Sequence, residues 1–141
     1  MDEKMKFVLD QCEGFSRKYM SSGELWGEVH MLLPMPHVDG TLSSVLIREL
    51  PSGQLFIDDY SDTFLHQHLT VEEAKEVAQH CGLHCEACEA DPELNDTGSS
   101  VECSMYCVVE RDRLEEGLHK MIRAIAYSHF VLGRRGMEVR A

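Results

Sequence analysis

Apolar residues recur at helical spacing in two long stretches, one near each end of the chain. In residues 3–20 the apolar positions are Met5, Val8, Leu9, Cys12, Phe15 and Tyr19. In residues 112–132 they are Leu114, Leu118, Met121, Ile122, Ile125 and Val131. A period close to 3.6 places such residues on one face of a helix. We therefore predict an amphipathic helix in each stretch, the second followed by a basic tail over residues 133–141.

The chain between these two helices predicts several strands and one more helix. Short β-prone runs separated by turn residues predict strands over residues 26–33, 41–50, 54–58, 83–90 and 101–109. Thr70 and Glu73 form a capping-box pattern, which predicts a helix to about Cys81 that is closed by Gly82. The order α-β-β-β-α-β-β-α predicts a single α+β domain over residues 1–132, with three helices and a mostly antiparallel sheet of about five strands.

The last two predicted strands are joined by a polar loop over residues 91–100, which predicts how they pair. A hairpin centred near Asn95 pairs residues whose numbers sum to roughly 190, and strand side chains alternate between faces. One face would then be small and apolar and is predicted to be buried: Leu83, Cys85, Ala87, Cys103, Met105 and Cys107. The opposite face would carry His84, Glu86, Cys88, Glu102, Ser104 and Tyr106.

Composition adds one strong feature, an uneven distribution of charge. The formal net charge is −12 at pH 7, and 13 acidic residues lie between Asp58 and Glu110, where Lys75 is the only base. Such a field repels nucleic acid and attracts basic surfaces. A merely solubilising acidic surface explains the same pattern.

The N-terminal segment, the apolar runs and the cysteines bear on the cellular compartment of the protein. The N-terminal segment MDEKMKFVLDQ is charged and unlike a secretory signal, and no apolar run approaches the roughly 20 residues of a membrane helix. Six cysteines in a chain without an export signal favour the cytoplasm, where thiols stay reduced. We therefore expect a cytoplasmic protein that does not associate with membranes.

Five potential metal ligands lie close together in the segment HCGLHCEAC: His80, Cys81, His84, Cys85 and Cys88. Thiolate and imidazole groups at short spacing are typical zinc ligands, and a closed site here would be a structural zinc that fastens the helix end to the next strand. Burial or simple exposure of the thiols explains the same residues without a metal. The sequence leaves both interpretations open.

Two adjacent carboxylates, Asp58 and Asp59, follow the strand predicted over residues 54–58, with Asp62 and His66 close behind. Together with Glu49 on the preceding strand, they suggest a metal-dependent nucleic-acid enzyme as an alternative function. A strand-end turn capped by local hydrogen bonds explains the same pattern. The chain contains no G-x-S-x-G, P-loop or dinucleotide motif.

Residues 24–132 resemble an uncharacterised domain family of phages, plasmids and other mobile elements. Domains of that family have a β-hairpin ending in a threonine-Asp-Asp-Gly turn, followed by a short helix, two strands and an amphipathic helix. Here the turn consists of Ile57-Asp58-Asp59-Tyr60. By type, a small and acidic protein without an enzymatic motif is similar to phage-encoded anti-restriction and anti-CRISPR inhibitors, many of which occupy the basic channel of a host nuclease.

These resemblances and the charge predict a non-enzymatic inhibitor in the host bacterial cytoplasm. It would bind a basic surface of a host defence nuclease, such as an RNA-guided effector, and would not bind nucleic acid itself. Clustered carboxylates would imitate the duplex, which carries about one charge per 1.7 Å of its axis. The predicted contact residues are Asp58, Asp59, Asp62, Glu72, Glu73, Glu76, Glu86, Glu89, Asp91, Glu93 and Asp96. A regulatory module is the remaining alternative.

Overall fold

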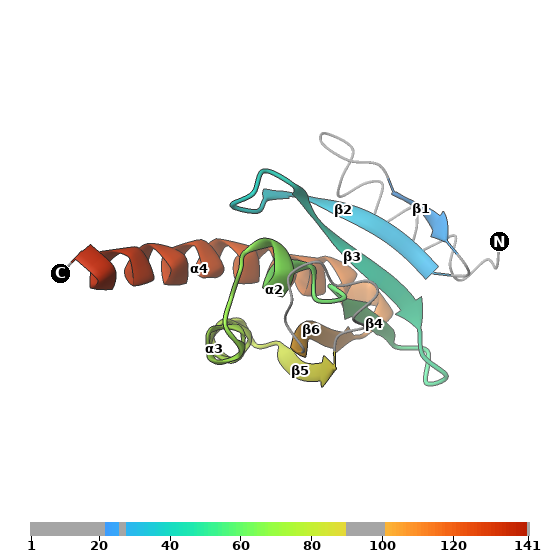
Figure 1. Cartoon of the computed structure of the whole chain (residues 1–141). Helices are drawn as coiled ribbons and strands as arrows, with labels where there is room; N and C mark the ends of the chain where they lie inside the picture. Colours follow the sequence, from blue (N-terminus) through green and yellow to red (C-terminus); the bar gives the residue numbers. More distant parts are fainter. Residues whose placement is uncertain (1–21, 26–27, 90–100, 141) are drawn as a thin grey trace.

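A six-stranded antiparallel sheet, with the strand order β1-β2-β3-β4-β6-β5, dominates the computed structural model, which describes residues 22–25, 28–89 and 101–140 (Figure 1). The strands are β1 (Ser22–Leu25), β2 (Glu28–Pro36), β3 (Leu42–Glu49), β4 (Leu55–Asp58), β5 (His84–Glu89) and β6 (Val101–Val109). The helices are α2 (Asp62–His66), α3 (Val71–Cys81) and α4 (Leu114–Arg140), the last preceded by the 3-10 turn η1 (Arg111–Arg113). The predicted α+β class is confirmed, and the helix predicted over residues 3–20 lies outside the described residues.

One face of the sheet forms the core because strand side chains alternate between the two faces. Met31 of β2, Ile47 of β3, Ile57 of β4 and Met105 of β6 all point to this face and are fully buried. Helix α4 covers it and comes closest at Gly117, where an added Cβ would lie 2.5 Å from the Cδ1 atom of Ile57. The absence of a side chain at Gly117 therefore sets the distance between helix and sheet.

The predicted pairing of β5 with β6 is confirmed. Cys85 lies opposite Met105, and His84 lies opposite Tyr106. On the face predicted to be buried, however, Ala87 is exposed and Cys85 is half-buried. The capping box before α3 is also confirmed, since the Thr70 side chain accepts a hydrogen bond from the Glu73 N–H and the Glu73 carboxylate accepts one from the Thr70 N–H. Gly82 closes the helix with a φ of 70°. Both features are local in sequence or depend on a single hairpin.

Strand β2 extends through Pro36, three residues past the predicted end of this strand at Leu33. The pairing of β2 with β1 ends at Met31, and its register with β3 shifts between Leu32 and Pro36. Among the described residues, no strand pairs with the outer side of β2 beyond Met31, and Pro34 and Pro36 lie in this stretch, where a missing N–H need not break a ladder bond. The short strand β1, which begins where the first helix was predicted to end, adds the sixth strand.

Helix α4 continues past its predicted end near Leu132 as far as Arg140, so residues 133–140 of the predicted basic tail are helical. In Figure 1 its last turns extend beyond the strands, on the side of α3. Arg134 Nη2 lies 2.8 Å from Glu76 Oε1, and Arg135 Nε lies 3.0 Å from Glu73 Oε2. These two ion pairs hold the extension of α4 against α3. No helix among the described residues is long and apolar enough to span a membrane.

Candidate functional site

The face of the sheet opposite the core carries an unusual group of exposed and half-buried side chains, which we call the outer face. Strand alternation places them there, because their neighbours in sequence point into the core. The group combines four acids with aromatic rings and one arginine: Glu28, Arg48, Phe56, Asp58, His84, Glu86, Glu102 and Tyr106. Phe56 and Tyr106 are only half-buried, and aromatic side chains are enriched in protein–protein interfaces relative to the rest of the surface.

Four of these side chains stack in a row across four strands. The Cζ atom of Arg48 lies 4.6 Å from the centre of the Phe56 ring. The Phe56 and Tyr106 rings are 5.1 Å apart, and the Tyr106 and His84 rings are also 5.1 Å apart. Cation–π and aromatic pairs of this geometry are each worth about 1 kcal/mol. The row therefore forms a preorganised surface, because neighbouring rings already hold each other in place.

Negative charge surrounds this row. Burial raises the pKa of Asp58, and the charge of Glu86 raises it further, while the Tyr60 N–H and Arg48 act in the opposite direction. Partial burial together with the charges of Glu28 and Asp58 also raises the pKa of Tyr60, a residue that is 53% exposed. The electrostatic coupling of these groups shows that acids from β2, β4 and β5 act on the same region of the outer face.

Asp59, predicted as a contact residue, is instead buried in the core. Only 3% of the residue is exposed, and its Oδ1 atom accepts hydrogen bonds from the Met105 N–H (2.9 Å) and the Ser61 N–H (3.1 Å). Burial raises its pKa to about 7, although these hydrogen bonds act to lower it. The carboxyl group therefore fastens the turn after β4 to β6 and is removed from any accessible acidic surface.

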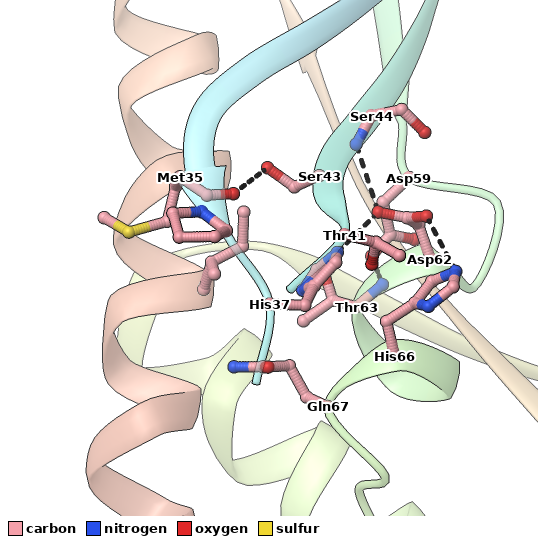
Figure 2. Close-up of polar contacts among 12 residues, drawn as sticks. Met35, His37, Thr41, Ser43, Ser44, Asp59, Asp62, Thr63, His66 and Gln67 are labelled. Atoms are coloured by element: carbon pink, nitrogen blue, oxygen red, sulfur yellow. Dashed lines mark hydrogen bonds and ion pairs between the residues drawn. The ribbon is translucent and has the colours of Figure 1, made fainter. Parts of the chain in front are cut away.

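Asp62 is also engaged within the protein, in the polar network of Figure 2. Its Oδ2 atom lies 2.7 Å from His37 Nε2 and accepts a hydrogen bond from the Ser44 N–H (3.0 Å). His66 lies 2.6 Å from Asp39 through its Nδ1 atom and stacks on His37. Since His37 Nε2 faces a carboxylate, this nitrogen carries the proton and donates. The network joins the connection between β2 and β3 to α2.

The other predicted contact residues divide into three groups. Glu73 and Glu76 are paired with Arg135 and Arg134, and Arg134 holds the pKa of Glu76 below its usual range. Glu86 is exposed on the outer face, whereas Glu72 is exposed on α3. Glu89 ends β5, and its side chain is not described. Asp91, Glu93 and Asp96 lie outside the described residues. Among the described residues, the polyanionic surface predicted from the sequence is thus reduced to the outer face.

The structure does not bring the five predicted zinc ligands into one group. His80 is exposed and stacks on Tyr127, whereas Cys81 is buried. The next three ligands alternate along β5: His84 and Cys88 are on the outer face, whereas Cys85 is half-buried on the core side. Across residues 22–25, 28–89 and 101–140, no three His, Cys, Asp or Glu side chains are arranged to hold a metal ion. Structural zinc stays a prediction.

The carboxylates of the alternative catalytic site also point apart. Asp58 lies on the outer face, whereas Asp59, the next residue, is buried on the other side. Glu49, the third carboxylate considered, accepts a hydrogen bond from Arg111 Nη1 at 2.6 Å. The three groups therefore do not converge on one cation. Strand alternation explains the separation, because consecutive residues at the end of β4 must face opposite sides.

The stacked row was not singled out as a site from the sequence. The predicted hairpin already placed His84 and Tyr106 side by side on its outward face. Alternation along residues 54–58 also placed Phe56 on the outward face of its own strand. The missing information was that β4, rather than β1 or β2, lies next to β6 in the sheet.

Comparisons with known proteins add no relative. No protein-family model matches the chain. No curated protein and no solved structure matches it either. The functional conclusion therefore depends on the geometry of the described residues.

Proposed function

We propose that the protein is a non-catalytic inhibitor that binds a basic, nucleic-acid-binding surface of another protein through its outer face. The observation that carries this proposal is the stacked row of Arg48, Phe56, Tyr106 and His84 with Asp58 and Glu86 beside it. Tyrosine and arginine are enriched among the few residues that dominate the binding energy of protein interfaces. Neighbouring acids supply the charge complementarity that a basic partner requires.

The partner we favour is a host defence nuclease, and in particular an RNA-guided effector, with the protein acting as a phage- or mobile-element-encoded inhibitor. A formal charge of −12 makes direct binding to nucleic acid unfavourable, because like charges repel at long range. The same charge accelerates association with a basic groove at low salt. Inhibition then follows from occupying the surface that the nucleic acid needs.

A nuclease inhibition assay with matched charge variants tests this proposal. We expect the protein to reduce target-DNA cleavage by an RNA-guided nuclease and to compete with DNA for the enzyme, increasingly so as salt is lowered. Glu86→Lys on the outer face should weaken inhibition by about tenfold, which corresponds to roughly 1.4 kcal/mol. Glu72→Lys is the control, because it makes the same charge change on α3, where the Glu72 side chain is 88% exposed.

His84→Ala tests the stacked row separately from charge. His84 is exposed at one end of the row, so its removal should weaken binding without unfolding the sheet. Equal effects of Glu86→Lys and Glu72→Lys would show that only net charge matters and would refute a site on the outer face. Failure to inhibit any RNA-guided or restriction nuclease at micromolar protein would refute the choice of partner.

A further inference from the structure

A groove of about 640 Å³ lies between the C-terminal end of α3 and the middle of α4. Helix α4 contributes Arg123, Ala126, Tyr127 and Phe130, which form one stripe because residues three, four and seven apart share a helix face. The volume falls in the range of small-molecule sites, which is about 300–1,000 Å³. Because α3 and α4 pack on the core side of the sheet, this groove is distinct from the outer face.

Aromatic rings form one end of the groove. The imidazole of His80 and the ring of Tyr127 are 3.9 Å apart and nearly parallel, with 6° between their planes. The hydroxyl of Tyr127 donates a hydrogen bond to Glu76 (3.2 Å), which fixes the orientation of that ring. Phe130 lies 5.6 Å from Tyr127 and is 59% exposed. This end therefore offers oriented ring faces on which a flat ligand would stack.

Positive charge lies toward the other end. Arg123 lines the groove, and Lys120 approaches Gly82, where an added Cβ would lie 3.9 Å from the Lys120 Nζ atom. Within the described part of the chain, neither cation has a hydrogen bond or ion pair with a carboxylate, whereas Arg135 is paired with Glu73. Burial raises the pKa of the Cys81 thiol, so the inner wall of the groove is uncharged and does not repel an anion.

We propose that this groove binds a planar aromatic anion, whose ring stacks on His80 and Phe130 and whose phosphate or carboxylate pairs with Arg123. The helical rise of 1.5 Å per residue separates positions 123 and 130 by about 10 Å along α4. This distance suits a molecule of two fused rings or of nucleotide size. Cations without a carboxylate partner beside oriented rings are unusual in a chain with a formal charge of −12. Together they favour a ligand that has both a planar ring and a negative charge.

Four probe ligands separate the contribution of ring stacking from that of the anionic group. Isothermal titration calorimetry would use AMP and naphthalene-2-carboxylate as ring anions, adenosine as the uncharged ring, and inorganic phosphate as the ring-free anion. We expect at least one ring anion to bind about tenfold more tightly than adenosine or phosphate. Binding of AMP alone would assign a phosphate ligand, and binding of naphthalene-2-carboxylate alone would assign a carboxylate ligand. No binding of either at millimolar concentration would overturn the proposal.

Surface variants keep the test independent of folding. Arg123→Gln should lower the affinity for the ring anion about tenfold and leave the affinity for adenosine unchanged. Phe130→Ala should lower the affinity for both ligands. Arg113→Gln is the matched control, because the Arg113 side chain is 67% exposed and lies outside the groove. An equal loss of affinity for the ring anion in Arg123→Gln and Arg113→Gln would refute the site. Concentration-dependent dimerisation that Phe130→Ala abolishes would assign the groove to a second copy of the chain and would also overturn it.

Discussion

Asp59 makes the stability of this protein depend on pH in a direction opposite to that of most carboxylates. The group is 3% exposed, and burial raises its pKa from 3.8 to about 7. Between these two pH values the folded protein retains a proton that the unfolded chain has lost. The free energy of unfolding therefore falls as pH rises through this window, with a limiting slope of about 1.4 kcal/mol per pH unit. Integrated from pH 5 to pH 7, the loss is roughly 2 kcal/mol.

Asp59→Asn should remove this dependence. An amide does not titrate in this range, and its oxygen still accepts the hydrogen bonds from the N–H groups of Met105 and Ser61. The amide nitrogen would face the Thr63 N–H, which now lies 3.4 Å from Oδ2, so we expect a lower stability at pH 5. The test therefore compares how much the free energy of unfolding changes between pH 5 and pH 7, and not its value at one pH.

Urea unfolding followed by circular dichroism at pH 5, 6 and 7 measures this change. Since histidines titrate in the same range, the wild-type curve alone is insufficient, and the difference between variant and wild type isolates Asp59. Asp112→Asn is the control, because Asp112 is exposed. We expect it to retain the wild-type slope. If the free energy of unfolding changed with pH equally in Asp59→Asn and in the wild type, Asp59 would be ionised from pH 5 to pH 7. Its hydrogen bonds would then outweigh the effect of burial on its pKa.

Two further predictions concern the backbone. Gly117→Ala should lower the free energy of unfolding by about 1–3 kcal/mol, because the added Cβ would collide with Ile57, whereas Gly133→Ala on the same helix should raise it by about 0.5–1 kcal/mol, because nothing lies within 4 Å. Thermal denaturation measures both, and equal effects would refute the close approach of α4 to β4. Tyr60→Gly should raise the free energy of unfolding by up to about 1 kcal/mol, because residue 60 has a φ of 49°. A loss of stability in this variant would show that the Tyr60 ring contributes more than its backbone strain costs.

Several features of the acidic surface were inaccessible from sequence because they depend on contacts between distant residues. Glu73 and Glu76 have charged partners near the end of α4, about sixty positions away. The pairing changes the meaning of the predicted acidic cluster, since these two carboxylates stabilise a helix–helix contact. Helix α2 was missed because it has only five residues, which are too few for an apolar period to indicate a helix. It follows a turn in which Tyr60 and Ser61 have positive φ angles and their N–H groups donate to the side chains of Asp58 and Asp59.

Residue patterns along the chain are enough to predict the α+β class, the alternation that separates core from outer face, the capping of α3 and the pairing of β5 with β6. These follow from local patterns, and a register shifted by one residue would turn Cys103, Met105 and Cys107 away from the core. The tertiary structure alone decided that β4 joins β6 and completes the stacked row, that Asp58 and Asp59 are separated, and that α3 and α4 enclose a groove. Such outcomes depend on which surfaces meet in space, and residue spacing along the chain carries no information about that.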